Sequence, residues 1–198
     1  SVLFSWSLTS ACVPSQWKTA FVKPLFKRKG SKLSVDNFRP ISKISSVGKL
    51  LEKIVTKNLM NHFLCNDALS NRQFGFRPKH STVTQLLSCL DTWTKSLSEK
   101  RTTYVCYVDF QKCFDSVVHS KLLVALRSKG IGPRLCAWIS SYLEGREQRV
   151  QLGEDILSQP APITSGIIQG SCIGPSLLLA LLGPLLDKLN SFNQVEAY

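Results

Sequence analysis

The sequence predicts an α+β fold, and three observations lead to that prediction. Apolar residues recur at helical spacing in several stretches, while short runs of β-branched and aromatic residues have the length and composition of strands. The two kinds of stretch do not alternate strictly, as the units of a parallel α/β sheet would. About 43% of the 198 residues are apolar, which is enough for a packed core.

The first part of the chain is expected to contain a strand, a basic loop and a second extended segment. Thr19–Phe26 has the composition of a strand, and Lys27–Asn37 is a basic stretch that contains Gly30. Phe38–Ile41 is expected to be extended, because Pro40 disfavours the helical conformation in the residue before it.

Two helices and an intervening loop are expected next. Lysines 49, 53 and 57 share the solvent side of a helix over Val47–Phe63. Asn71–Lys79 is expected to be a loop, and the spacing of Thr82 and Gln85 fits a capping box for the following helix. The apolar faces are predicted from Val47, Leu50, Leu51, Ile54, Val55 and Leu59 in the first helix, and from Val83, Leu86, Leu87, Leu90, Trp93 and Leu97 in the second.

The second half is expected to combine three helices with a hairpin and a glycine-rich turn. The hairpin pairs Gln148–Leu152 with Ile156–Leu157 around Gly153. Three glycines lie in the turn Ser165–Pro175, which precedes the last helix. The expected helices are His119–Lys129, Pro133–Glu144 and a segment from Pro175 to about Leu189.

Positive charge is concentrated in one segment of the chain. Between Gln16 and Lys57 there are eleven Lys or Arg residues and two acids, while the formal charge of the whole chain is +12. Such a block predicts a polyanionic partner, most often nucleic acid. The alternative is a basic face that is merely solvated.

Seven cysteines and three histidines form no metal or disulfide pattern. The number of cysteines is odd and no C-x-x-C pair occurs, which fits an intracellular, reducing compartment. The most apolar run, Pro175–Leu186, is too short for a membrane span, and Gly183 and Pro184 interrupt it. No signal peptide opens the chain, and it starts without methionine, so we expect it to be cut from a longer protein.

An acid follows the most strand-like run of the sequence. Tyr104–Val108 is aromatic and mostly β-branched, which predicts a buried strand, and it ends on Asp109. Burying an unpaired carboxylate is unfavourable, whereas a carboxylate is the kind of oxygen ligand that Mg²⁺ prefers. Asp109 is therefore a candidate metal ligand, with a solvated strand end or helix cap as the alternative.

Four stretches taken together resemble reverse transcriptases of the non-LTR retrotransposon, group II intron and retron kind, and most of all the first of these. Each stretch alone is only moderately specific, but the four in this order are very specific. The resemblance covers residues 13–198. The stretches are Asn37–Ser42 (NFRPIS), Gln73–Pro78 (QFGFRP), Val108–Val117 (VDFQKCFDSV) and Gly166–Pro175 (GIIQGSCIGP).

The resemblance implies the right-hand fold of polymerases. Residues 1–103 would form a fingers region with a basic N-terminal segment. Residues 104–198 would form an incomplete palm, an antiparallel sheet backed by helices, without the last catalytic hairpin and without a thumb.

The resemblance also implies a site for two-metal phosphoryl transfer. Asp109 would be the catalytic residue and would bridge two Mg²⁺ ions, for which Mn²⁺ could substitute. The backbone carbonyl of Phe110 would complete one coordination shell. The cations that would hold the incoming triphosphate are Lys27 and Arg39, with Lys23 and Lys29 as alternatives to Lys27.

Further residues receive roles from the same resemblance. Phe114 would lie beneath the sugar and favour deoxynucleotides, although simple core packing is the alternative. Asp115 would support the turn rather than bind metal. Gln169 and Gly170 would contact the nucleotide, and the residues expected to contact template or primer are Arg77, Gly166 and Ser171.

The sequence departs from the family pattern in three places. The segment after Pro175 reads SLLLALLGPLLD, where the family commonly has aromatic residues and an Asn-Asp pair. Ile168 stands where the family has proline or a basic residue. Tyr198 stands where the family has an aromatic residue followed by a small residue and two aspartates, and no aspartates follow it here. Glu154, Asp155 and Asp187 are not expected to replace them.

The resulting prediction is a reverse transcriptase fragment whose partners are an RNA template, a DNA primer and deoxynucleoside triphosphates. In its longer parent it would act as an RNA-directed DNA polymerase, in the nucleus if synthesis is target-primed. Alone it is expected to be inactive. The main alternative is an inactive retroelement remnant that binds RNA or an RNA–DNA duplex. Phe114 argues against a third alternative, RNA-directed RNA synthesis.

Overall fold

The computed structural model describes residues 2–153, 156–192 and 195–198. Glu154 and Asp155 therefore lie outside the described residues. The helices are α1 (Val2–Thr9), α2 (Ser46–Cys65), α3 (Thr82–Ser98), α4 (His119–Ser128), α5 (Pro133–Leu143) and α6 (Gly174–Asn190), with 3₁₀ turns η1 (Ser15–Trp17) and η2 (Val35–Asn37). The strands are β1 (Thr19–Phe26), β2 (Phe38–Lys43), β3 (Arg146–Leu152), β4 (Ile156–Leu157) and β5 (Ala161–Ile163).

One mixed sheet joins strands from both halves of the chain. Its order is β2-β1-β3-β4, with β5 also paired to β3. The pair β1–β2 is antiparallel, with Phe26 opposite Phe38, whereas β1 and β3 run parallel, with Thr19 opposite Glu147. The mixture of helices and strands confirms the coarse prediction. Within residues 104–198, where antiparallel strands were expected, β3 pairs antiparallel with both β4 and β5, and the parallel pair joins this part to β1.

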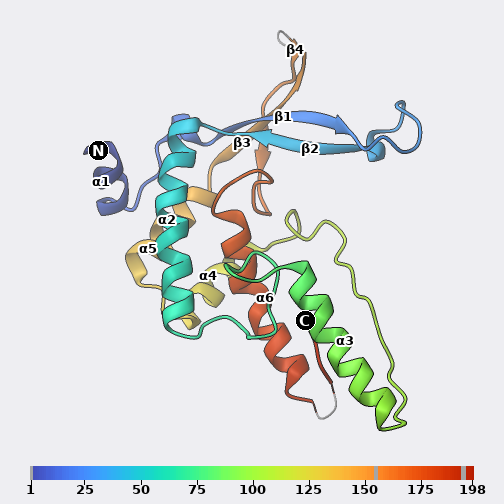
Figure 1. Ribbon diagram of the computed structural model, residues 1–198. Coiled ribbons are helices and arrows are strands. Elements are labelled where there is room, and N and C mark those ends of the chain that lie inside the picture. The colour runs from blue at the N-terminus through green and yellow to red at the C-terminus, as the bar shows by residue number, and fades with distance from the viewer. Residues whose placement is uncertain (1, 154–155, 193–194) are drawn as a thin grey trace.

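The core lies where four helices meet beneath the sheet, as Figure 1 shows. Helix α6 contacts α2 and α4 there, α4 also contacts α5, and α1 packs against α5. Trp138 and Phe63 are the largest fully buried side chains. Within the described residues, no helix combines the length and the apolar character needed to cross a membrane.

Several local predictions are confirmed because their signals are short-range. Strand β1 has the predicted bounds, and Gln151 pairs with Leu157 in the predicted hairpin. Gly130 and Gly145, which follow α4 and α5, have positive φ values of 77° and 62°. Positive φ is accessible to glycine without a steric penalty, so these positions end helices reliably. Helix α1 and the short strand β5 were not predicted.

Helix α2 has a buried face that differs from the predicted one. Leu51, Val55 and Leu59 are buried as expected, but the apolar residues Val47, Leu50 and Ile54 are exposed. The core covers only one narrow side of this helix, and an acid, Glu52, lies on that side.

The predicted strand Tyr104–Val108 is absent, and this prediction was wrong. Residues 101–110 have no regular secondary structure, and Tyr104 and Tyr107 are 94% and 87% exposed. A strand is stabilised by hydrogen bonds to a neighbouring strand and by burial of at least one face. None of the strand pairs among the described residues includes this segment, so its composition alone does not make it a strand.

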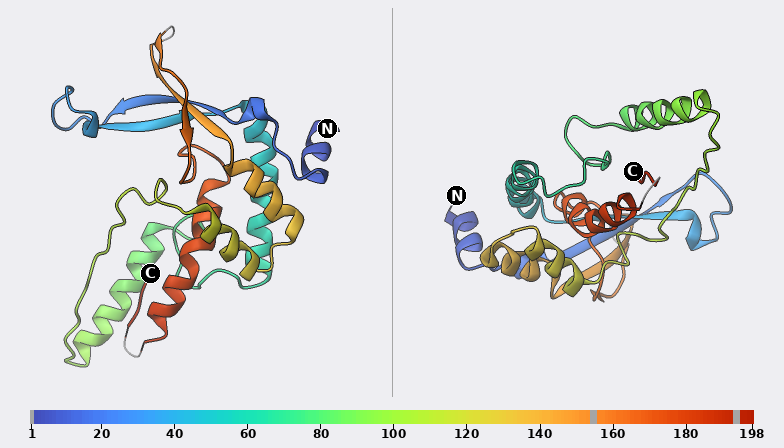
Figure 2. Two further views of the ribbon diagram at one scale, coloured as in Figure 1. Left: turned by 180° about the vertical axis from the view of Figure 1, so that it is seen from behind. Right: turned by 90° about the horizontal axis from the view of Figure 1, so that it is seen from below.

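Helix α3 forms as predicted but does not bury its apolar residues. None of its side chains is buried, and Figure 2 shows the helix standing away from α4, α5 and α6. Its capping box consists of Ser81 and Thr84, one position before the predicted pair. The apolar residues expected in the core but exposed here are Val83, Leu86, Leu87, Leu90 and Leu97.

The two sides of α2 should respond very differently to truncation. Leu59 is 1% exposed and Ile54 is 46% exposed. We expect Leu59→Ala to lower the free energy of unfolding by about 2–5 kcal/mol, because it leaves a cavity in the core. Ile54→Ala should change it by about 0.5 kcal/mol or less. Urea denaturation of the 198-residue chain measures both values, and similar losses would contradict the assigned face.

Candidate functional site

The candidate site is built around the glycine loop, which we define as Ser165–Gly174. The loop follows β5 and leads directly into α6. Gly166 and Gly170 have φ values of 84° and 107°, in the region that favours glycine. A Cβ on Gly166 would lie 2.8 Å from the Asp115 backbone, and one on Gly170 would lie 2.7 Å from the Ser42 carbonyl oxygen. The loop therefore requires glycine for conformation and for close approach.

Backbone hydrogen bonds attach the glycine loop to the segment that follows Asp109. The Ile167 N–H donates to the Phe114 carbonyl at 2.8 Å, and the Gly166 N–H donates to the Val117 carbonyl at 2.8 Å. A ring nitrogen of His119 lies 2.8 Å from the Gly166 carbonyl oxygen. The first half of the loop is thereby fixed against the turn 112–117.

A further backbone contact attaches the loop to β2. The Ser42 N–H donates to the Gln169 carbonyl at 3.2 Å. Arg39 lies three residues earlier on the same strand, opposite Leu25 of β1. The predicted triphosphate-binding strand and the predicted nucleotide-binding loop are therefore adjacent.

These three segments enclose one concavity. Asp115 lines it from the turn, Ser42 from β2, and Gln169 from the glycine loop. The structure thus brings together parts of three of the four predicted motifs. The full lining is Val22, Pro40, Ser42, Asp115, Gln148, Ile163, Ser165, Gly166, Ile167, Ile168 and Gln169.

Asp109 and Phe110 do not line this concavity. Both are exposed and lie in the irregular segment before the turn. Asp109 is close enough to Cys113 for its charge to add to the effect of burial, and together they raise the pKa of that thiol. Among the described residues, no three His, Cys, Asp or Glu side chains are grouped to hold a metal ion. The described side chains therefore do not fit a complete two-metal site.

Phe114 is half-buried and packs against the hydrophobic core. Its carbonyl accepts the hydrogen bond from the glycine loop described above. This position is compatible with the packing alternative, and the backbone of Phe114 lies next to the loop. Asp115, one residue later, is exposed at the edge of the concavity.

The predicted cations on the basic side of the sheet are exposed. Lys27 directly follows β1, and its ammonium group donates to the Asp36 carbonyl at 2.7 Å. Arg39 is also exposed. The hairpin formed by β1 and β2 projects from the body of the molecule in Figure 1 and carries both residues near its tip.

Two residues predicted to contact template or primer have internal partners. Arg77 donates through Nη1 to the Ser70 carbonyl at 2.8 Å, within its own loop. The Ser171 hydroxyl accepts a hydrogen bond from the Gly174 N–H at 3.1 Å. Both contacts order the loops that carry these side chains.

Tyr198 lies beside the QFGFRP loop. Its ring is 6.0 Å from that of Phe74, and its hydroxyl donates to Glu196 at 2.7 Å. Arg72 forms a 2.9 Å ion pair with Glu196, and Thr92 of α3 donates to the same carboxylate. The hydrogen bond from Arg72 is the main reason that the pKa of Glu196 falls to about 2.

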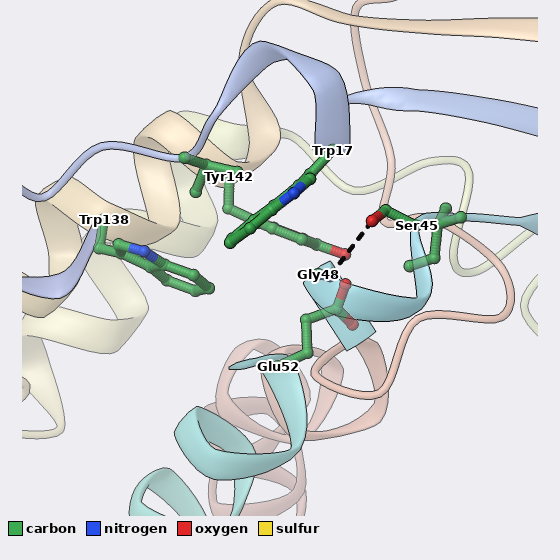
Figure 3. Close-up of a pocket in the computed structure, with 8 residues that line it drawn as sticks. Trp17, Ser45, Gly48, Glu52, Trp138 and Tyr142 are labelled. Carbon is green, nitrogen blue, oxygen red and sulfur yellow. Dashed lines mark hydrogen bonds between the residues drawn. The ribbon is translucent and has the colours of Figure 1, made fainter. Parts of the chain in front are cut away.

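Sequence reasoning missed Glu52, which is 3% exposed although it is an acid. Figure 3 shows its carboxylate below Tyr142 in a small pocket that is also lined by Trp17, Ser45 and Gly48. The available signal was its position between Leu51 and Val55, on the apolar side of α2. An acid in that position is unusual unless it has specific partners.

Polar groups from three other elements surround this carboxylate. Cys172 and Ile173, at the end of the glycine loop, donate their N–H groups to Glu52 Oε2 at 2.7 and 3.4 Å. Tyr142 of α5 and Arg146 of β3 are its side-chain neighbours. Burial raises the pKa of Glu52, and these four groups partly oppose the rise.

Comparison with known proteins agrees with this arrangement. Residues 27–198 match the family model described as "Reverse transcriptase (RNA-dependent DNA polymerase)". That stretch contains β2, the turn, the glycine loop and Glu52, and therefore all segments of the candidate site.

Relatives over most of the chain include proteins of insect retrotransposons. The chain is 30% identical over 177 residues to the "RNA-directed DNA polymerase from mobile element jockey" of Drosophila melanogaster, covering 89% of this chain and 19% of that protein. It is 32% identical over 183 residues to the "Probable RNA-directed DNA polymerase from transposon BS" of the same species, covering 92% and 20%. It is 32% identical over 180 residues to the "Retrovirus-related Pol polyprotein from type-1 retrotransposable element R2" of Popillia japonica, covering 90% and 24%.

The chain thus spans about a fifth to a quarter of the length of these relatives. Because the family model matches nearly the whole chain and the matched residues fold into one site, the chain belongs to the reverse transcriptase family, with relatives among the RNA-directed DNA polymerases of non-LTR retrotransposons.

Proposed function

We propose that this chain forms the nucleotide-binding part of an RNA-directed DNA polymerase. The observation that carries the proposal is the concavity between β2, the turn at Phe114 and Asp115, and the glycine loop. These are the segments to which the family resemblance assigns the incoming nucleotide. In the longer protein, a primer 3′-hydroxyl would attack the α-phosphate of a deoxynucleotide, and pyrophosphate would leave.

The cations on the hairpin formed by β1 and β2 support the proposed binding of a triphosphate. Arg39 is exposed on β2 and directly precedes Pro40, which lines the concavity, and Lys27 directly follows the paired strand. A guanidinium makes planar, bidentate contacts with phosphate, while an ammonium acts as a point charge. We assign both to the triphosphate, and we assign Gln169 and Gly170 to the nucleotide itself.

The same proposal assigns the nucleic-acid strands to the loops around the concavity. Gly166 and Ser171 belong to the glycine loop, and Arg77 belongs to the loop before α3. Their hydrogen bonds keep these loops in one conformation, which lowers the entropic cost of binding an extended strand. The polymer bound would be an RNA template paired with a DNA primer.

The carboxylates among the described residues limit the catalytic activity that we expect of the chain alone. Reverse transcriptases generally use divalent metal ions, and Asp109, with the Phe110 carbonyl, is the ligand that we propose for Mg²⁺ or Mn²⁺. A single exposed carboxylate is not sufficient for two ions, and the described residues contain no group of three or more possible metal ligands. We therefore expect the 198-residue chain to bind nucleic acid without extending a primer.

A second function is favoured by the exposure of Asp109 and by its absence from the concavity lining. The chain would then be part of an inactive remnant that binds RNA or an RNA–DNA duplex through its basic face. The codons that follow Tyr198 in the reading frame discriminate between the two. Ala-Asp-Asp or a close variant favours the polymerase, and a stop codon favours the remnant.

The basic loop between β1 and β2 should dominate the salt dependence of nucleic-acid binding. We expect the triple variant Arg28→Gln, Lys29→Gln, Lys32→Gln to weaken binding to an RNA–DNA duplex, because three phosphate contacts are lost. The magnitude of the slope of log K against log salt should fall by about 2.7, which is about 0.9 for each lost contact. Fluorescence anisotropy at several salt concentrations measures the slope.

A matched control removes the same charge elsewhere. The variant Lys121→Gln, Arg134→Gln, Lys188→Gln changes exposed residues on α4, α5 and α6. It should leave the slope nearly unchanged. Equal effects of the two triple variants would show that binding follows net charge alone and would contradict a contact at the loop.

Asp109 should be required for synthesis but not for template binding. In an active longer protein that contains this chain, Asp109→Ala is expected to reduce primer extension by at least 10³-fold or so, because charge stabilisation in the transition state is lost. Duplex affinity should stay within about twofold. Gel-based extension and anisotropy measure the two quantities, and extension retained in the variant would remove Asp109 from the catalytic role.

Phe114 should influence the choice of sugar. In the same longer protein, Phe114→Val is expected to raise ribonucleotide incorporation relative to deoxynucleotide incorporation by about tenfold, because a smaller side chain leaves space for a 2′-hydroxyl. Single-nucleotide insertion kinetics give this ratio. If the ratio is unchanged while the melting temperature falls, the ring serves only the packing seen here.

A further inference from the structure

The second half of the glycine loop has a partner that no nucleotide-binding role requires. Glu52 comes from the second turn of α2, about 120 residues before the loop in sequence, and its carboxylate is buried. Its Oε2 atom accepts hydrogen bonds from two consecutive loop amides, Cys172 at 2.7 Å and Ile173 at 3.4 Å. Both amides belong to residues immediately before α6.

The location suits a negative charge for a physical reason. The first N–H groups of a helix have no intrahelical acceptor, and the helix dipole places partial positive charge there. Ile173 is the N-cap residue of α6, and its own side chain supplies no capping hydrogen bond. Within the loop, the Ser171 hydroxyl accepts from the Gly174 N–H, and Glu52 supplies from another helix the acceptor for the Ile173 N–H.

Tyr142 and Arg146 are the side-chain neighbours of the carboxylate. Tyr142 is buried, and its hydroxyl has no hydrogen-bond partner among the described residues, although Glu52 and Ser171 are its polar neighbours. Arg146 is 2% exposed and donates to the backbone carbonyls of Tyr142 and Trp17, at 3.0 Å each. Its guanidinium lies over the Tyr142 ring, 4.8 Å from the centroid.

We propose that Glu52 is a positioning residue that fixes the glycine loop at the start of α6, so that Gln169 faces the concavity and Gly170 stays against Ser42 of β2. The loop is then held on one side by Ser42 of β2 and on the other by Glu52 of α2. The link to Gln169 and Gly170 rests on the proposed nucleotide site, whereas the anchoring itself does not.

The anchoring is tested by hydrogen exchange on the 198-residue chain without any ligand. Glu52→Gln retains a carbonyl oxygen that can accept both amides, whereas Glu52→Met has similar size and no acceptor. We expect amides 170–174 to exchange about tenfold faster in Glu52→Met, and near the wild-type rate in Glu52→Gln. Mass-spectrometric exchange of peptides that cover the loop measures this difference.

Two further variants keep the test decisive. Glu147→Met and Glu147→Gln alter an exposed acid on β3 and should leave loop exchange unchanged. If Glu52→Met does not fold, Glu52→Asp replaces it, because the shorter carboxylate cannot reach Ile173 and should also speed exchange at that amide. Equal exchange in the wild type and in every folded Glu52 variant would overturn the anchoring role.

A kinetic measurement separates this inference from the proposed function. In an active longer protein, Glu52→Met should raise the KM for deoxynucleotide by about tenfold, and Glu52→Gln should restore it. Faster exchange with a raised KM confirms both parts of the inference. Faster exchange with an unchanged KM would support the anchoring but contradict the assignment of the loop to the nucleotide.

Discussion

The backbone hydrogen bonds of the glycine loop determine where every other part of the candidate site lies. Ile167 bonds to Phe114, Gln169 bonds to Ser42, and Cys172 bonds to Glu52. These contacts join segments that are far apart in sequence. Because backbone amides and carbonyls are used, the arrangement depends on chain geometry more than on the side chains of the loop. Gly166 and Gly170 permit the close approach that such contacts need.

Glu52 illustrates how a carboxylate can serve as a hydrogen-bond acceptor within the fold although its burial is unfavourable. Burial of a carboxylate is unfavourable, and the raised pKa of Glu52 reflects that. Two amide donors at a helix N-terminus and a nearby guanidinium offset part of this penalty. Removing only the carboxylate would leave the Cys172 and Ile173 amides without their acceptor. Retaining such a group makes physical sense when the loop must adopt one conformation.

Patterns among neighbouring residues predicted much of the secondary structure. They predicted little about which distant segments pack together. The sequence correctly predicted the bounds of β1, the helix ends at Gly130 and Gly145, and the turn before α6. Tyr104–Val108 did not, because a strand forms only where another strand accepts its hydrogen bonds. The apolar side of α3 likewise remained exposed, since amphipathic spacing predicts a helix but not the surface that covers it.

By itself, the sequence determined the family, the basic strand pair and the residue types of the site, because motif order and composition are one-dimensional properties. Only the tertiary structure decided that Asp115, rather than Asp109, lines the concavity with Gln169. It also decided that an acid on α2 caps α6. Residues that form hydrogen bonds across about a hundred positions of sequence show no pattern in the local sequence. Their burial and hydrogen bonding are determined only when the elements pack together.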